Sequence, residues 1–281
     1  MTKLAVDEQI HTLQLFRTSF TLALLFTLLV WETTAPFFPL FTNRNRDRCR
    51  HGVRNLFFGL ANSLLTSLAV VALWGVAARF ANHHHLGLLN WLSPSRPARL
   101  FLGIILFDCW MYWWHRLNHR LDFFWRFHRT HHSDPKMDVT TAYRFHFGEI
   151  IFSSLFRAPI IVLLGMNLPE LVVYETLMFA VVQLHHANVA LPRRLDRLLR
   201  CFIVTPSIHK VHHSRLQPET DSNYSSLFSW WDRAFKTLNL RDPATIQYGL
   251  VQFDSPNQQT ISGLIKTPLG ESRADDKSNP A

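Results

Sequence analysis

Long apolar runs separated by short polar or basic stretches dominate the pattern along this 281-residue chain. A helix that crosses a bilayer needs roughly 20 predominantly apolar residues, and several of the runs approach or reach that length. Prolines, glycines and charged residues bound the runs, as expected where helices end. We therefore predict five membrane-spanning helices, over residues 13–31, 56–78, 100–114, 147–165 and 168–191.

Two of these runs depart from a simple span. The third is short and leads directly into a group of histidines, and the fourth contains Arg157, which favours a re-entrant or interfacial segment. Glu175 in the fifth run could line a cavity or pair with Arg157. The alternative, that several runs are core helices of a soluble helical protein, is disfavoured by their length and their aromatic edges.

A basic stretch between the first two runs predicts how the bundle is oriented. Its arginines are Arg44, Arg46, Arg48, Arg50 and Arg54. Positively charged loops favour the cytoplasmic side, so the amino terminus is expected outside. With five spans, residues 115–146 and 192–281 then both lie on the cytoplasmic side.

The distribution of charge and the spacing of the cysteines argue against a nucleic-acid-binding protein and against a disulfide-rich or thiolate-metal protein. The net charge of +9 could indicate nucleic acid, but no nucleic-acid motif is present and the arginines cluster beside apolar runs, which favours an anionic membrane surface. We therefore expect no nucleic-acid partner. Cys49, Cys109 and Cys201 are widely spaced, which indicates neither a disulfide framework nor a thiolate metal site.

Three histidine groups carry the chemistry of the chain. They are His115 with His119, then His128, His131 and His132, and finally His209, His212 and His213. Helical residues three or four apart share a face, so each group directs its imidazoles one way. Eight nitrogen donors exceed the needs of one tetrahedral zinc and suit two metals. A straight helix would put His119 and His128 on opposite faces, so a break near residues 120–122 is required.

Further polar residues lie near these groups. His146 is either an extra ligand or the start of a helix, and Glu149, one turn later, is a candidate acceptor for a ligand imidazole. At the end of the fifth run we prefer His186 to His185 as a ligand, because His186 stays close in helical angle to Gln183 and Glu175.

Asp108 and Asn188 complete the candidate set around the metal. Asp108 shares a helix face with His115 and could orient its ring, or instead cap a helix or neutralise an arginine. Asn188 adds a polar group at the end of the fifth run. The histidines at 83–85 are expected in a surface loop, and His11 and His51 lack a matching set of partners.

The histidine groups and their surroundings resemble the fatty acid hydroxylase/sterol desaturase superfamily. The resemblance covers roughly residues 100–240. It is carried by DCWMYWWHRLNH at 108–119, WRFHRTHHS at 125–133, RFH at 144–146, HAN at 186–188, TPSIHKVHHS at 205–214, and the NY and WD pairs at 223–224 and 231–232. The sequence departs from the pattern of this superfamily at two places. Ser225-Ser226 replaces a glycine that often follows the Asn-Tyr pair, and Phe235-Lys236-Thr237 replaces the usual Phe-Gly-Thr. Both put the fit of the substrate in question more than metal binding.

This resemblance implies an all-α, integral-membrane helical bundle with a cytoplasmic cap in which histidines hold two iron ions. It further implies that O₂ and two electrons oxidise a C–H bond of a lipid substrate, by hydroxylation or desaturation. The eight histidines of the three groups are the implied ligands, with His146 and His186 as further matches. No haem motif of a fused cytochrome b5 is present, so a separate donor of cytochrome b5, ferredoxin or reductase type is expected.

The resemblance also predicts the organisation and location of the chain. Residues 1–95 are expected to form an N-terminal transmembrane hairpin, 96–245 the catalytic domain and 246–281 a polar tail that is loose after Asp254. The expected location is a bacterial inner membrane or the endoplasmic reticulum, with several spans.

Three other functions remain as alternatives. An acyl desaturase of the other histidine-box family usually has its first two boxes further apart than His119 and His128. A zinc hydrolase would require an HExxH arrangement, but Arg116 follows His115. A non-catalytic metal transporter or sensor would more plausibly distribute its ligands along a path at mid-membrane depth.

Overall fold

The computed structural model describes residues 3–41, 44–67 and 71–270, and within them the chain is helical, with no strand. Two isolated antiparallel bridges, Ile203 with Phe228 and Ser214 with Tyr248, are the only extended pairings in this part of the chain. The all-α prediction is therefore confirmed for the described residues.

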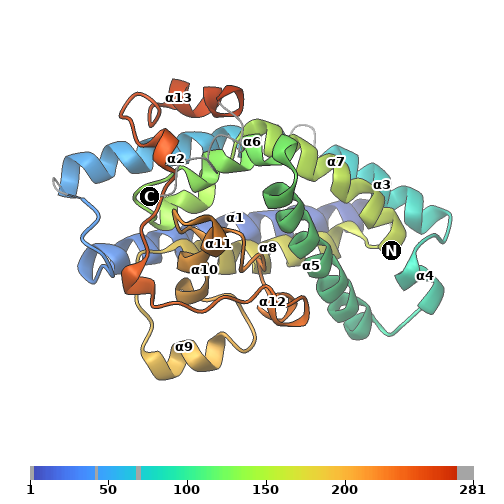
Figure 1. Ribbon diagram of the computed structural model, residues 1–281. Coiled ribbons are helices and arrows are strands. Elements are labelled where there is room, and N and C mark those ends of the chain that lie inside the picture. The colour runs from blue at the N-terminus through green and yellow to red at the C-terminus, as the bar shows by residue number, and fades with distance from the viewer. Residues whose placement is uncertain (1–2, 42–43, 68–70, 271–281) are drawn as a thin grey trace.

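Long helices form the body of the molecule. They are α1 (Lys3–Thr34), α2 (Arg44–Leu65), α3 (Val71–His83), α5 (Arg96–Arg120), α7 (Phe147–Leu164) and α8 (Leu168–His186). Helices α1 and α8 pack side by side along the long axis of the molecule, and α3 packs on α7 (Figure 1). The core between α3, α5, α7 and α8 is apolar and includes Phe107, Ile161 and Tyr174.

Local chemistry explains the tight connection between α7 and α8. Gly165 ends α7 in the left-handed region at φ 74°, where an added Cβ would lie 2.8 Å from the Leu86 carbonyl oxygen. Asn167 then caps α8 by accepting from the Glu170 amide, while the Glu170 carboxylate accepts from the Asn167 amide. This reversal places the end of α7 beside the start of α8. Both lie at the opposite end of the bundle from the histidines, which are at the end of α8.

Short elements surround the histidine end of the bundle. They are α4 (Leu88–Leu92), α6 (Asp122–His132), η2 (Val139–Tyr143), α9 (Arg193–Leu199), α10 (Pro206–His212), α11 (Gln217–Thr220), α12 (Trp230–Ala234), η3 (Pro243–Thr245), η4 (Val251–Phe253), α13 (Ile261–Lys266) and η5 (Thr267–Leu269). The labelled short helices α6 and α9 to α13 lie toward the end where α8 terminates (Figure 1), and η2 and α10 contact α8 directly.

Within the described part of the chain, two helices are long and apolar enough to cross a membrane, over His11–Thr34 of α1 and Phe147–Leu164 of α7. They correspond to the first and fourth predicted spans. The second predicted span does not form one described helix, because it is shared between α2 and α3 and its residues 68–70 lie outside the described residues. The third lies within α5, and α8 covers the fifth only as far as His186.

Arg157, which weakened the prediction for the fourth span, lies in the middle of the continuous helix α7. Its Nη1 is 2.7 Å from Oε1 of Glu175 on α8, and its guanidinium packs over the Trp74 ring. Of the two roles left open for Glu175, pairing with Arg157 is therefore the one observed. A paired arginine is far less costly in an apolar environment than an isolated one.

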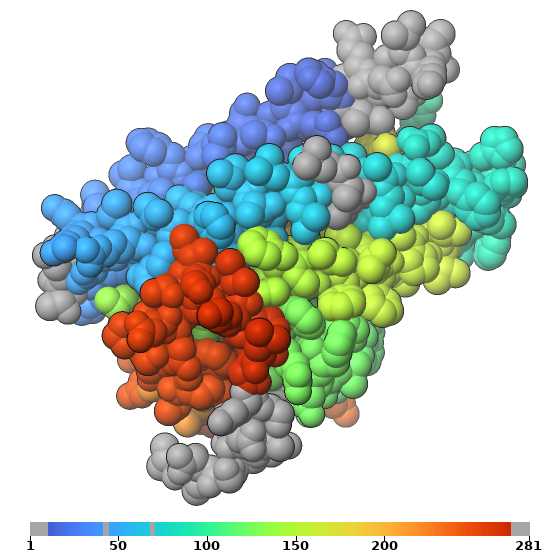
Figure 2. All heavy atoms as spheres, turned by 90° about the horizontal axis from the view of Figure 1, so that it is seen from above, coloured from blue at the N-terminus to red at the C-terminus, as the bar shows by residue number. Residues whose placement is uncertain are grey.

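The segment after Asp254 is folded as far as Gly270, so the prediction of a loose tail is wrong for this part. Figure 2 shows the C-terminal residues as a compact mass against α2 and α6. Gln259 in this segment is buried, and α13 is capped by the Thr260 side chain. Residues 271–281 of the predicted tail lie outside the described residues.

Candidate metal centre

Nine histidines converge into two adjoining groups at one end of the bundle. The first group is His115, His119, His128, His132 and His212, and the second is His131, His186, His209 and His213. Within each group the ligand nitrogens all lie within 4.8 Å of one another. The rings of His132 and His213 stack with centroids 4.5 Å apart, which joins the two groups.

A break between two helices brings the first two histidine groups together. Helix α5 ends at Arg120, Leu121 is extended at φ −103° and ψ 116°, and α6 begins at Asp122. The predicted break is therefore confirmed. It allows His119 and His128 to face one another, with ring centroids 4.9 Å apart.

Helix α6, and helix α10 together with its cap residue His213, each place histidines in both groups. Adjacent helical residues point about 100° apart, so the neighbours His131 and His132 enter different groups, and so do His212 and His213. The repeated spacing in the sequence thus corresponds to two similar short helices that face each other across the site.

Hydrogen bonds fix the direction of several rings. The Nδ1 atom of His115 donates to the Tyr224 carbonyl, and that of His212 to the Ser222 carbonyl, each at 2.7 Å. His128 Nδ1 donates to Glu149 Oε1 at 2.8 Å. Carbonyl oxygens only accept, so these rings carry their proton on Nδ1 and present a bare Nε2 lone pair.

The bare Nε2 atoms point at one another. His115 Nε2 lies 3.1 Å from His128 Nε2 and 3.0 Å from His212 Nε2. In the second group, His186 donates its Nδ1 proton to Val182, and its Nε2 lies 3.0 Å from His131 Nε2. Converging lone pairs without a proton between them repel. A cation among them removes that repulsion, so the donor set fits a metal in each group.

Electrostatics keep these rings neutral. Burial, and after it the neighbouring imidazoles, hold the pKa of His132, His209 and His213 well below its usual range. His131 behaves in the same way. Metal binding requires neutral imidazole, so the site already holds its ligands in the competent form.

Comparison with known proteins agrees with this geometry. Residues 100–237 match the model of the fatty acid hydroxylase family. Residues 100–237 therefore belong to the fatty acid hydroxylase family. All nine converging histidines lie inside the matched segment.

Named relatives include two kinds of lipid-modifying protein. Alkylglycerol monooxygenase of Xenopus tropicalis is 33% identical over 169 residues, which cover 60% of this chain and 36% of that protein. The human protein of the same name is 32% identical over 58% of this chain and 34% of its own length. Ornithine lipid hydroxylase OlsE of Rhizobium tropici is 31% identical over 54% and 45%.

The chain thus matches less than half of the length of these relatives. No solved structure matches it significantly.

Of the other residues that the sequence proposed for the metal site, His146 lies outside both groups. Its Nδ1 accepts from the Gly148 amide and caps α7, while its Nε2 lies 3.1 Å from the Ile265 carbonyl. The helix-start role is therefore the observed one. Glu149 contacts the ring of His128, one of the converging histidines, through the hydrogen bond from His128 Nδ1 to its Oε1.

Asp108 and Asn188 have roles that the sequence did not predict. Among the described residues Asp108 contacts none of the converging histidines and pairs with no arginine: it accepts from Tyr174 Oη, the Phe228 amide and Trp231 Nε1 at 2.9–3.0 Å. Asn188 bonds the backbone of Phe38 on the loop after α1. Asp108 and His115 do lie on one continuous helix, but Asn188 lies beyond the end of α8, and the segments that pack on both residues were not predicted.

His185 lies beside the second group without belonging to it. Its ring stacks on His209 at 3.7 Å, and both of its nitrogens are buried without a hydrogen-bond partner. The preference for His186 as the converging residue agrees with this geometry. The histidines at 83–85 are exposed, as expected for a surface loop.

Sequence reasoning missed His51, which is buried next to the segment that follows α6. Its Nε2 lies 2.9 Å from Asp134 Oδ1, and its Nδ1 lies 3.4 Å from Asp138 Oδ2. Burial alone would lower the pKa of His51, but the two aspartates raise it to about 9. In the sequence, Asp134, which follows the second histidine group, pointed to a partner of this kind. Its position did not identify His51, which lies 83 residues earlier.

This ion pair predicts a loss of stability in alkali. The pKa of His51 in the folded chain is about 9, above its ordinary value of 6.5. Its contribution is therefore complete below pH 6.5 and lost as the pH rises through 9. We expect the free energy of unfolding in detergent to fall by about 2 kcal/mol from pH 7 to 10 through this group.

The His51→Gln variant tests this expectation. It should be less stable at pH 7 and should show a shallower decline toward pH 10, whereas the exposed His84→Gln control should follow the wild type. An unchanged slope in His51→Gln would contradict the assignment.

Proposed function

We propose that this chain is a membrane-bound oxygenase that hydroxylates a C–H bond of a lipid, with two irons held by the nine converging histidines. The bare Nε2 atoms of His115, His128 and His212, which meet at 3.0–3.1 Å, are the observation that carries the metal part of the proposal. The names of the relatives, an alkylglycerol monooxygenase and an ornithine lipid hydroxylase, support a lipid substrate.

The donor set restricts the metal. Imidazole binds iron, copper and zinc, but zinc has no redox chemistry and cannot activate O₂ by electron transfer. We therefore favour iron, in agreement with the family. When bound, it would supply the redox chemistry for O₂-dependent attack on an unactivated C–H bond. The two electrons are expected from a separate donor protein or reductant.

Apolar side chains shield the histidine rings from water. Phe145 stacks on His131 at 4.2 Å, and Trp125 packs against His119 and His132. The main apolar cluster continues from Met111 on α5 to Val182 on α8, one turn before His186. Such walls suit an acyl or alkyl chain and exclude bulk water from the reacting carbon.

One ligand suggests where the substrate enters. His115 is partly exposed, whereas the other eight histidines are buried. We therefore place the approach of the lipid on the side of His115, where the exposed Trp113 lies two residues earlier on α5. Glu149 and the Tyr224 carbonyl hold the Nδ1 protons of His128 and His115 and so keep these rings fixed while the lipid binds.

The expected placement in the membrane follows from the ends of the helices. Helices α5 and α8 both end at the histidine groups, and the basic start of α2 lies at the same end of the bundle (Figure 1). Positively charged segments favour the cytoplasm, which supports a cytoplasmic site. We retain residues 1–95 as the N-terminal transmembrane part and 96–245 as the catalytic domain, with 246–281 following it.

Oxygen consumption by the purified full chain tests the function. Reconstituted with Fe(II), a reductant and a lipid, it is expected to consume O₂ and add one oxygen atom to the lipid, measured by mass spectrometry with ¹⁸O₂. An alkylglycerol and an ornithine lipid are the first substrates to compare, with the same bilayer lacking both as control. Metal binding without lipid-dependent O₂ uptake would favour a transporter or sensor instead.

A further inference from the structure

Arg144 brackets the two adjacent histidines at the end of α6. It is fully buried, and its Nε donates to the Thr130 carbonyl at 2.9 Å while its Nη2 donates to the Ser133 hydroxyl at 2.8 Å. Thr130 directly precedes His131, and Ser133 directly follows His132. One guanidinium therefore hydrogen-bonds to the residues on both sides of the pair, to a backbone carbonyl before it and to a side-chain hydroxyl after it.

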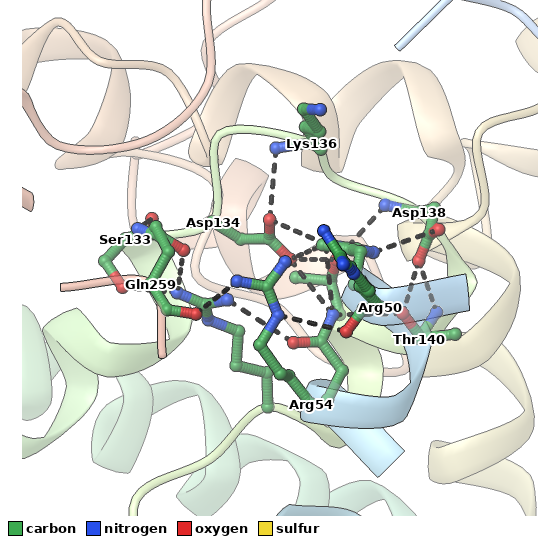
Figure 3. Close-up of polar contacts among 12 residues, drawn as sticks. Arg50, Arg54, Ser133, Asp134, Lys136, Asp138, Thr140 and Gln259 are labelled. Carbon is green, nitrogen blue, oxygen red and sulfur yellow. Dashed lines mark hydrogen bonds and ion pairs between the residues drawn. The ribbon is translucent and has the colours of Figure 1, made fainter. Parts of the chain in front are cut away.

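Gln259, far away in the sequence, completes this arrangement. Arg144 Nη2 donates to Gln259 Oε1 at 2.8 Å, and Gln259 Nε2 donates to the carbonyls of Ser133 at 2.8 Å and Phe253 at 2.7 Å. Arg54 also donates to the Gln259 backbone carbonyl, as Figure 3 shows. The Gln259 side-chain amide thus accepts from Arg144 and donates both of its protons, which connects the end of α6 to the C-terminal segment.

A second contact joins the C-terminal segment to α6 on the other side of the pair. Arg129 Nη2 donates to the carbonyls of Thr267 at 2.7 Å and Gly270 at 2.9 Å, and its guanidinium packs over the Phe253 ring. Arg129 and Ser133 lie one helical turn apart and enclose His131 and His132. Both ends of the last turn of α6 are therefore attached to the C-terminal segment.

Charged groups make this network sensitive to the loss of any member. Asp134 is buried and accepts from His51 at 2.9 Å and Thr141 at 2.7 Å, and the charge of Arg144 lies close to it. Removing one partner of a buried charged network leaves the others unsatisfied, which costs more than the bond itself. The family segment ends at residue 237, so the C-terminal segment lies beyond it.

We propose that residues 253–270 are a positioning element of the metal centre, and that Gln259 and Arg144 fix the last turn of α6 so that His131 and His132 enter different groups. This inference rests on the proposed function, because it requires metal in both groups. A small rotation of that turn would move both rings at once, since they leave the same helix about 100° apart.

Cobalt(II) binding to the full chain tests the inference without any assay of activity. The chain is purified in detergent, stripped with a chelator and titrated with Co²⁺, whose visible spectrum reports ligand number and geometry. Loss of an outer partner typically weakens metal binding 10- to 100-fold, and we expect a weakening of about 10-fold or more in Gln259→Ala, with an altered spectrum.

Gln258→Ala is the matched control. Gln258 is the neighbouring residue, but the hydrogen bonds of its side chain to described residues go only to Ser255 and the Gln252 carbonyl. It should keep the affinity and spectrum of the wild type. A purely structural role for Gln259 would lower the unfolding temperature of Gln259→Ala while leaving its spectrum at saturating Co²⁺ unchanged.

Two results would overturn the inference in different ways. If wild type binds two Co²⁺ and Gln259→Ala binds two with equal affinity and the same spectrum, the inference fails and the proposed function stands. If wild type itself binds no Co²⁺ through its histidines, the proposed function fails and the inference with it.

Discussion

His131→Ala and His132→Ala are expected to remove different metals from the same chain. His131 belongs to the second group and His132 to the first, although they are consecutive residues of α6. Each variant should therefore retain about one metal where wild type retains two. Each should lose lipid-dependent O₂ uptake by more than about 100-fold, since even the loss of an outer partner can cost that much.

Metal analysis of the purified variants, together with O₂ uptake, measures this. His146→Ala is the control, because His146 caps α7 outside both groups and should leave metal content at wild-type level. The double variant His128→Ala/His131→Ala removes one ligand from each group and should lose both metals. Two metals per chain in that double variant would show that these histidines are not the ligands.

How much of this site the sequence predicted depends on how far apart in the sequence the contacting residues are. The spacing of four within each triplet was sufficient to predict that His128 and His132 share a direction, and that His209 and His213 do, because helical periodicity sets the directions of nearby residues. The break at Leu121 followed from the same geometry. Both are properties of a few consecutive residues, and both were confirmed.

Contacts between distant segments were beyond the reach of that reasoning. Periodicity placed Asp108 on the face of His115, but the side chains opposite Asp108 come from Tyr174 and the loop before α12. The pairing of His51 with Asp134 and the attachment of Gln259 to Ser133 likewise join residues 83 and 126 positions apart. Only the packing of the helices determines which polar groups meet.

Asp108→Ala is expected to be among the most destabilising single changes in the chain. The buried carboxylate accepts from Tyr174 Oη, the Phe228 amide and Trp231 Nε1, and alanine would leave all three donors without this acceptor. At about 1–3 kcal/mol for each buried unsatisfied group, the free energy of unfolding should fall by about 3 kcal/mol or more. Denaturation in detergent, followed by tryptophan fluorescence, measures this loss.

The effect of Asp108 should also reach the metal centre, and unequally. The loop that Asp108 holds at Phe228 also contains Tyr224, whose carbonyl accepts from His115 Nδ1. A loosened loop should therefore weaken metal binding in the first group, whereas within the described residues no histidine of the second group hydrogen-bonds to this loop.

Asp122→Ala, an exposed acid at the start of α6, is the control and should change stability by less than about 1 kcal/mol. Equal weakening of both groups in Asp108→Ala would contradict this route, because a general loosening of the fold does not distinguish the two metals.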